Sequence, residues 1–244
     1  METTPTAPGS PGGWEHLAPG VARRRLPFLD VTVGVVVGDD GVLLIDTGSS
    51  VPEGAGLRQE VRELTGRDVT DIALTHGHFD HVFGTAAFED VQVFGEMTLG
   101  AYLERERSSL AADAVGHGVD EEEAAQAVRA LVYPGHLVVG SYVLDLGGDR
   151  QVLLVHPGDG HTAHDLVVVV LGTPAVVFCG DLVEESGEPQ AGPDAAPQAW
   201  PAALDELLRL GGETALYVPG HGAVVDARFV RAQRDALAAR FPSA

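Results

Sequence analysis

Short apolar runs rich in valine, leucine and isoleucine recur along most of the chain, and turn-forming residues separate them. Runs of this kind, bounded by Gly, Asp or Pro, are typical of buried strands. Asp39, Asp40 and Gly41 separate the first two runs and predict a hairpin turn. We predict strands at 31–37, 42–45, 72–74, 91–94, 142–146, 152–155, 166–171, 175–178 and 216–218.

A second pattern, with apolar residues three or four positions apart, predicts helices between several of these strands. In 53–65 the apolar residues share one face, and Gly66 ends the pattern. Asp120 is predicted as the N-cap of another helix, since the acidic residues that follow it suit a helix N-terminus. Further helices are predicted at about 97–110, 201–210 and 226–241. The order of elements indicates a mixed α and β protein with helices outside two sheets.

Length and composition fit one large domain. The chain has 244 residues, of which 45% are apolar, enough for a sizeable core. We predict a flexible N-terminal tail at 1–25 and a single domain at 26–244, with a helical insertion at about 95–146. No apolar stretch reaches the ~18–20 residues that span a membrane, and no secretory signal is visible. With a single cysteine, Cys179, these features favour a cytoplasmic protein.

The formal net charge of −21 narrows the choice of partners. It argues against nucleic acid, because the phosphate backbone would be repelled. The one basic cluster, Arg23 to Arg25, is interpreted as a solvated entry to the first strand. All 15 basic residues are arginine, so any mechanism that needs a lysine is excluded. We expect a small-molecule substrate and no membrane or nucleic-acid partner.

The chemically most informative stretch follows the predicted strand at 72–74. It places His76, His78, Asp80 and His81 within six positions, and both imidazole and carboxylate are good ligands for zinc and similar metals. Alternate side chains of an extended segment point the same way, so the first two histidines can converge while the other two residues turn toward a second point. Clustered histidines also occur by accident on surfaces, but four ligand types at this spacing favour a metal site. Three or four ligands are needed for each metal, so others must lie further along.

Three later segments place ligand-type residues directly after apolar strands. His161 lies in Gly-Asp-Gly-His-Thr, Asp181 in Phe-Cys-Gly-Asp, and His221 in Val-Pro-Gly-His-Gly. A glycine next to each residue lets backbone approach a crowded centre. Each residue alone could be an ordinary turn residue, but together they supply the missing ligands.

In this order, the segments resemble the metallo-β-lactamase superfamily from about residue 30 to 225. The match comprises Asp46 after the second strand, HxHxDH at 76–81, Gly-His-Thr at 160–162, Gly-Asp at 180–181 and Pro-Gly-His-Gly at 219–222. The resemblance implies an α/β fold, an αββα sandwich of two mixed β-sheets flanked by helices, with metals at one edge of the sheets.

The resemblance also implies a dinuclear site. It assigns the first metal to His76, His78 and His161, and the second to Asp80, His81 and His221. Asp181 would bridge the two ions, and Asp46 would lie behind the ligands without binding metal. The implied cofactors are two divalent ions, zinc foremost, with iron or manganese as alternatives.

Two metals about 3.5–4 Å apart can share a water and lower its pKa toward ~7. We therefore expect a metal-dependent hydrolase whose metal-bound hydroxide cleaves an ester, thioester, lactone or amide, with Asp80 and Asp181 as catalytic residues. A mononuclear-iron persulfide dioxygenase is one alternative, because it shares the scaffold. A β-lactam hydrolase is another, although many of those hold the substrate with a lysine and carry cysteine at the position of Asp181. A binding module with a decayed site is disfavoured by the complete ligand set.

The remaining histidines and the cysteine have less specific environments. His117 and His136 are predicted as ordinary surface or loop residues, and His156 as structural. His164, three residues after His161, is left with two readings, support of a ligand or contact with substrate. Cys179 is predicted as a packed, inert thiol.

Overall fold

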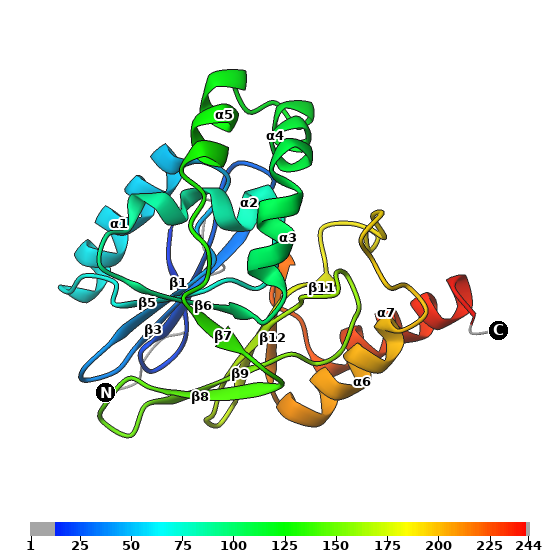
Figure 1. The fold of residues 1–244 in the computed structure, drawn as a ribbon. Coiled ribbons are helices and arrows are strands. Elements are labelled where there is room, and N and C mark those ends of the chain that lie inside the picture. The colour runs from blue at the N-terminus through cyan, green and yellow to red at the C-terminus, as the bar shows by residue number, and fades with distance from the viewer. Residues whose placement is uncertain (1–12, 243–244) are drawn as a thin grey trace.

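The computed structural model describes residues 13–242, which form two β-sheets packed face to face with helices on both outer sides (Figure 1). The first sheet has seven strands in chain order: β1 (Glu15–Ala18), β2 (Val21–Arg25), β3 (Thr32–Val37), β4 (Val42–Ile45), β5 (Asp71–Ala73), β6 (Gln92–Glu96) and β7 (His136–Val138). The second has five, in the order β12 (Leu216–His221), β11 (Val176–Glu184), β10 (Val167–Val170), β9 (Gln151–Val155) and β8 (Ser141–Asp145). The predicted αββα sandwich is confirmed.

The helices divide between the two outer faces (Figure 1). On the side of the first sheet lie α1 (Val51–Thr65), α2 (Phe79–Val82), the 3₁₀ helix η1 (Phe83–Ala87), α3 (Leu99–Arg105), α4 (Arg107–Gly116) and α5 (Glu121–Arg129). On the side of the second sheet lie α6 (Trp200–Gly211) and α7 (Ala227–Arg240). Among the helices at residues 13–242, none combines the length and apolarity that a membrane crossing requires.

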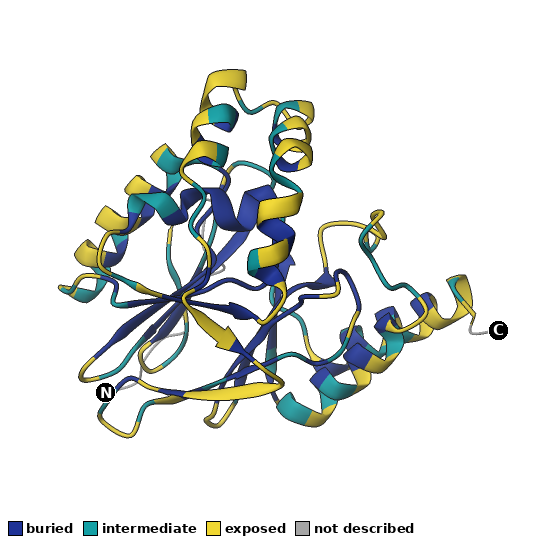
Figure 2. Ribbon diagram, in the orientation of Figure 1, coloured by how far each residue is buried: buried dark blue, intermediate teal, exposed yellow. Residues whose placement is uncertain are grey.

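Strands that are apolar on both faces explain the layered core, drawn in dark blue in Figure 2. In β4, Val42 and Leu44 pack toward the helices of the first sheet, while Leu43 and Ile45 pack between the sheets. Successive side chains of a strand point to opposite faces, so a continuous apolar run is buried on both sides. A third apolar layer joins the second sheet to α6 and α7.

Parallel pairing brings the strand ends that carry polar residues to one edge. β4, β5, β6 and β7 run parallel, as do β11 and β12. An isolated bridge between Val31 and His221 connects the two sheets at this edge. The end of β4, the end of β5 and the C-terminal parts of β11 and β12 therefore meet there.

The prediction of a flexible tail at 1–25 is wrong for residues 15–25, which contain two strands. β1 and β2 pair with each other, and β2 pairs with β3. Arg23 is buried rather than solvated: its guanidinium donates to Glu15 at 2.8 Å and to the carbonyl of Gly222 at 2.9 Å. These tertiary partners, rather than the local sequence, order the hairpin. Residues 1–12 lie outside the described part of the chain.

Two further boundaries differ from those predicted. The helical part of the insertion covers α3 to α5, and from His136 onward the chain forms the edge strands β7 and β8. β11 continues to Glu184, well beyond the predicted strand end at 178, because its bulged end still pairs with β12. Asp120 is the N-cap of α5 as predicted, accepting from the backbone N–H groups of Glu122 and Glu123.

Candidate metal centre

The HxHxDH segment leaves β5 and turns directly into α2. His76 lies in the connecting loop and His78 is the N-cap of α2, while Asp80 and His81 lie inside the helix. Loop and helix geometry thus separate the four side chains into two pairs that face neighbouring points. This is the divergence that the sequence predicts, although it arises from a helical turn rather than from an extended strand.

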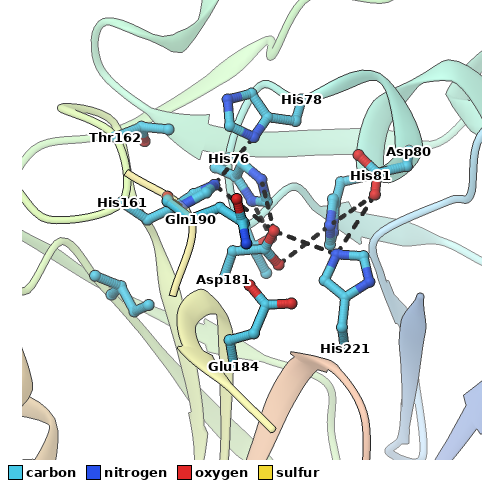
Figure 3. Close-up of polar contacts among 12 residues, drawn as sticks. His76, His78, Asp80, His81, His161, Thr162, Asp181, Glu184, Gln190 and His221 are labelled. Atoms are coloured by element: carbon cyan, nitrogen blue, oxygen red, sulfur yellow. Dashed lines mark hydrogen bonds and ion pairs between the residues drawn. The ribbon is translucent and has the colours of Figure 1, made fainter. Parts of the chain in front are cut away.

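Two groups of side chains could each hold a metal ion (Figure 3). Within each group, one ligand atom of every residue lies within 4.8 Å of the others. The first group is His76, His78, His161 and Asp181, and the second is Asp80, His81 and His221. The structure therefore gathers all seven residues that the sequence selected, in the two predicted sets; that they bind metal stays a prediction.

Asp181 lies between the two groups. Its Oδ2 atom is 3.7 Å from His76 Nε2 and 3.6 Å from His161 Nε2. Toward the second group, Oδ1 is 3.3 Å from His81 Nε2 and Oδ2 is 3.3 Å from His221 Nε2. Two ligands of one tetrahedral zinc, each ~2.0–2.1 Å from the ion, lie about 3.3 Å apart. The carboxylate is thus at suitable distances to share in both groups.

Asp80 completes the second group from α2. Its Oδ2 atom is 3.4 Å from His221 Nε2 and 3.7 Å from His81 Nε2. In the first group, His161 Nε2 lies 3.0 Å from His78 Nδ1. These separations again match neighbouring ligands of one ion rather than an ordinary salt bridge.

Close backbone approach makes this packing feasible, as the glycines beside the ligands predict. A Cβ atom at Gly220 would lie 1.8 Å from Asp181 Oδ1, so that position admits no side chain. A Cβ at Gly77 would lie 2.6 Å from the ring of Tyr102 and 2.9 Å from His164 Nε2. Larger residues at either glycine would displace the ligand-bearing segments.

Each of three histidines uses its outer nitrogen for a hydrogen bond that sets the ring's orientation. The Nδ1 atom of His221 lies 2.8 Å from the carbonyl of Leu29, and that of His161 lies 3.1 Å from the carbonyl of Gln190. A carbonyl only accepts, so these Nδ1 atoms carry a proton, and Nε2, which faces the centre, is the nitrogen available to bind metal. This arrangement is the usual one for histidines that bind metal.

His81 is held the same way by Asp46. Asp46 Oδ2 lies 2.8 Å from His81 Nδ1, and the same carboxylate accepts the backbone N–H of Thr75 at 2.8 Å and its hydroxyl at 2.7 Å. Asp46 adopts a left-handed backbone conformation (φ 59°) at the end of β4 and is buried. It lies behind the ligands, as the family resemblance implies.

His78 is oriented by a residue that the sequence did not indicate. Its Nε2 lies 3.1 Å from Asp194 Oδ2, which also accepts the hydroxyl of Tyr102 at 2.9 Å. Burial opposes the charged form of His78, but Asp194 outweighs it and raises the pKa of the histidine. The remaining atom, Nδ1, faces His161 and the first group.

Several atoms aimed at the centre lack a hydrogen-bond partner within residues 13–242. They are His76 Nε2, His81 Nε2 and Asp181 Oδ1, all almost fully excluded from solvent. Unsatisfied buried polar atoms are rare in folded proteins and call for a ligand. Lone pairs of imidazole and carboxylate converging on two points are a donor set that suits divalent zinc. The residues present therefore fit the implied ions.

The pKa values of the histidines also fit a site for divalent cations. Burial and the neighbouring histidines lower the pKa of His76 and bring that of His161 to about 4, so both rings are neutral. Burial also disfavours the charged form of His221, but Asp181 and Asp80 outweigh it and raise its pKa to about 10. The carboxylates of the centre thus stabilise positive charge, which bound cations would supply.

A cavity of about 820 Å³ opens over the two groups. Its floor includes His78, Asp80, His161, Asp181 and His221. One wall comes from α3, α4 and the residue that follows α4, and the other from the end of β11 and the segment after it. Together they contribute Tyr102, Arg105, Glu106, Ser109, Leu110, Asp113, His117, Glu184, Ser186, Gln190, Gly192, Pro193 and Asp194. A small molecule bound here would lie directly against the candidate metal centre.

Glu184 projects into this cavity from the end of β11. Its Cα pairs with His221 across the strands, and Figure 3 shows its carboxylate beside Asp181 and His221. Burial and the charge of Asp181 raise the pKa of Glu184 to about 7. Its backbone N–H donates to Gln233 Oε1 at 3.0 Å, while Gln233 Nε2 donates to the carbonyl of Leu182 at 2.7 Å. A buried amide from α7 thus clamps the strand end that carries the carboxylate.

The other singled-out residues lie beside the centre or away from it. His117 is exposed at the cavity rim and His136 is exposed on β7. His156 donates from Nδ1 to the carbonyl of Asp165 at 2.8 Å, a structural role. Cys179 is buried, and burial raises the pKa of its thiol, in keeping with an inert side chain.

His164 lies outside the cavity lining and packs against Tyr102, with ring centroids 4.2 Å apart. Burial lowers its pKa to about 3, so the ring is neutral. Of its two predicted readings, contact with substrate is not supported by this position. Asp165 holds the same loop, accepting the backbone N–H of Thr162 at 2.9 Å and its hydroxyl at 2.7 Å.

Sequence reasoning missed Tyr102, Glu184 and Asp194. Glu184 lies three residues after Asp181 on a strand, a spacing that the predicted strand end at 178 concealed. Tyr102 and Asp194 meet across 92 residues, and no local pattern signals such a contact.

Comparison with known families supports the resemblance. The family model described as "Metallo-beta-lactamase superfamily" matches residues 26–221, which is most of the chain. Among curated proteins, the "Metallo-beta-lactamase type 2" of Bacillus cereus is 26% identical over 190 residues, covering 76% of this chain and 64% of that protein. The chain thus matches somewhat less than two thirds of that relative's length.

Solved structures show the same fold. A metallo-β-lactamase from Pontibacter korlensis superposes with a TM-score of 0.70 at 22% identity, covering 92% of this chain and 98% of that one. The metallo-β-lactamase FIM-1 from Pseudomonas aeruginosa, in its mono-zinc form, superposes with a TM-score of 0.69 at 19% identity, covering 95% and 96%. At these identities the likeness supports the architecture alone.

Proposed function

Because the chain belongs to the metallo-β-lactamase superfamily, we propose that it is a metal-dependent hydrolase that cleaves an ester, thioester, lactone or amide bond of a small molecule. The observation that carries this proposal is the pair of ligand groups joined by Asp181 at the floor of an 820 Å³ cavity. We propose two divalent ions as cofactors, zinc foremost, with His76, His78 and His161 holding one, Asp80, His81 and His221 the other, and Asp181 both.

Bound there, divalent ions would act as Lewis acids and lower the pKa of a water toward ~7. The reaction adds one water: its oxygen bonds to the acyl carbon, the bond to the leaving group breaks, and the leaving group takes a proton. Asp80 and Asp181 are the catalytic carboxylates of this proposal, since both line the cavity and face the reacting centre. Tyr102 and Leu110 form the wall against which the substrate packs.

The decisive experiment is the metal content per chain of protein purified without added metal or chelator, followed by assays on thioesters, lactones and simple esters. Close to two zinc ions per chain, with hydrolysis that chelation abolishes and zinc restores, is the expected result. One iron per chain with oxygen uptake on persulfides would instead assign the dioxygenase alternative. A metal-free chain that hydrolyses these substrates at full rate would refute both.

β-Lactam hydrolysis is the second candidate, because the curated relative from Bacillus cereus carries that name. A chromogenic cephalosporin tests it directly. This chain offers no lysine for the lactam carboxylate, and its cavity places Glu184 and Asp194 next to the metal groups. We therefore expect turnover of the cephalosporin to be at least about 100-fold slower than that of the best ester, since like charge at a binding site costs affinity.

A further inference from the structure

Glu184 differs from every other carboxylate that lines the cavity in forming no close ion pair with an arginine or histidine among the described residues. Its side chain accepts a single long hydrogen bond, from the hydroxyl of Ser186 at 3.3 Å. It is nonetheless about nine-tenths buried, with 9% of its surface exposed. Buried carboxylates are ordinarily paired or bound to metal.

The other cavity carboxylates are already engaged. Glu106 Oε1 accepts from Arg105 Nε at 2.7 Å, and Asp113 Oδ1 lies 3.4 Å from His117 Nδ1. Asp194 accepts from both His78 and Tyr102, and Asp80 and Asp181 belong to the ligand groups. One anionic group therefore remains to be satisfied in the cavity.

The carboxylate of Glu184 is also preorganised. Gln233, itself buried, donates to the carbonyl of Leu182 and accepts the backbone N–H of Glu184 at the irregular end of β11, and so fixes the direction in which Glu184 leaves the strand. The neighbouring Glu185 turns away and accepts the backbone N–H of Ala223 at 2.7 Å. Two adjacent glutamates thus have separate tasks, one holding a turn and one facing the cavity.

Positive side chains are scarce on the cavity walls. Among residues 13–242, Arg105 is the one arginine that lines the cavity, and it is committed to Glu106 and to the face of Tyr102. Apolar surface is available from Leu29, Phe79 and Leu110. The walls therefore suit a molecule with one apolar part and one positively charged part.

We propose that Glu184 is a specificity-determining residue that binds a cationic group, such as an ammonium, carried by the acyl part of the substrate close to the bond that is cleaved. This inference rests on the proposed hydrolase function and names its substrate class: small acyl compounds bearing a positive charge. The substrate cation forms the ion pair that Glu184 does not form with any described residue.

Three 4-nitrophenyl esters with acyl chains of matched length test the proposal. Their acyl chains end in trimethylammonium, in tert-butyl, which has the same shape without charge, or in carboxylate. The zinc-loaded wild type is expected to prefer the cationic to the neutral ester at least tenfold in kcat/KM, and to use the anionic ester least. Glu184→Gln should bring the cationic-to-neutral ratio close to one.

Glu106→Gln is the matched control, because it removes a cavity carboxylate that Arg105 already neutralises; its ratio should stay near that of the wild type. An unchanged ratio in Glu184→Gln would overturn the proposal. A wild-type preference for the anionic ester would overturn it as well and would assign recognition to Arg105.

A binding measurement separates this inference from the proposed function. The matching ethers, in which a CH₂ group replaces the ester carbonyl so that no bond can be hydrolysed, are titrated into zinc-loaded protein by calorimetry. Tighter binding of the cationic ether that Glu184→Gln abolishes supports the inference even if no ester is hydrolysed, a result that would refute only the hydrolase. Equal binding of the cationic and neutral ethers by the wild type would refute the inference alone. Thermal unfolding of each variant confirms that it is folded.

Discussion

The two halves of the candidate metal centre are held by different parts of the molecule. In the second group, His81 is oriented by the buried Asp46 at the end of β4, and His221 by the carbonyl of Leu29. In the first group, His78 and His161 both form hydrogen bonds with the irregular segment after β11, to Asp194 and to the carbonyl of Gln190. One half is anchored in the sheet and the other is supported by a loop.

The difference extends to the burial of one hydrogen-bonded pair in each half, although His161 of the first group is more buried than His221 of the second. The side chains of His81 and Asp46 are 0% and 2% exposed, whereas those of His78 and Asp194 are 22% and 25% exposed. Buried charge-assisted hydrogen bonds are stronger and more costly to break than bonds that water can replace. We infer that the sheet-anchored half is rigid and that the loop-supported half is the one that responds to changes at the cavity.

Removing the residue that joins the halves should have the largest effect. Asp181→Ala deletes the carboxylate shared by both groups, so we expect the affinity for each metal ion to fall on the order of 100-fold or more. This loss exceeds the one usually caused by removing a residue that only hydrogen-bonds to a ligand. Hydrolytic activity should disappear with the metal. Elemental analysis of the purified variant checks this, with Glu188→Ala, an exposed acid, as control. Two ions per chain in Asp181→Ala would contradict the assignment.

Asp46→Asn should disturb the sheet-anchored half alone. The amide keeps the shape but withdraws the charge from His81 and offers an N–H where the ring also donates, so the affinity of one ion should fall about 10–100-fold. Because three buried hydrogen bonds depend on Asp46, we also expect the free energy of unfolding to fall by about 1–3 kcal/mol. Zinc titration and urea denaturation measure the two effects. A loss of affinity without any loss of stability would argue against the anchoring role.

Asp194→Asn should disturb the loop-supported half alone, and less strongly. We expect a loss of affinity for one ion of about tenfold, at the low end for such contacts, and a change in stability within about 0.5 kcal/mol, as for a partly exposed site. A combined variant identifies the ion concerned: in His221→Ala, which retains the first group, Asp194→Asn should still weaken zinc binding, whereas Asp46→Asn should add little. If Asp46→Asn weakened zinc binding in this background and Asp194→Asn did not, the distinction between the two halves would be wrong.

The sequence was informative wherever function imposed a local pattern. The seven ligand-type residues could be found because each follows an apolar strand, and strands of one sheet direct their ends to a common edge. The position of Asp46 behind them was implied by the family resemblance, because its local sequence alone favours an ordinary turn residue. The distances between the ligand atoms depend on how the strands pair, and a single sequence does not show that pairing.

The features that could not be predicted depend on contacts between distant segments. Arg23 is one of three consecutive arginines and gives every sign of a solvated residue, yet it is buried because Glu15 and the carbonyl of Gly222 satisfy it. Asp194 lies in a stretch rich in Gly, Pro and Ala with no periodicity, and its partner His78 is 116 residues away. Local pattern carries no information about either contact.

The hydrogen bond from His221 to the carbonyl of Leu29 spans 192 residues, and that from Arg23 to Gly222 spans 199. Contacts so distant along the chain form late, because closing such loops costs conformational entropy before any pairing compensates for it. During synthesis, the second ligand group stays incomplete until His221 has left the ribosome. Loading of both ions is thus expected only after His221 has emerged, and a nascent chain that stops before His221 has no complete centre to fill.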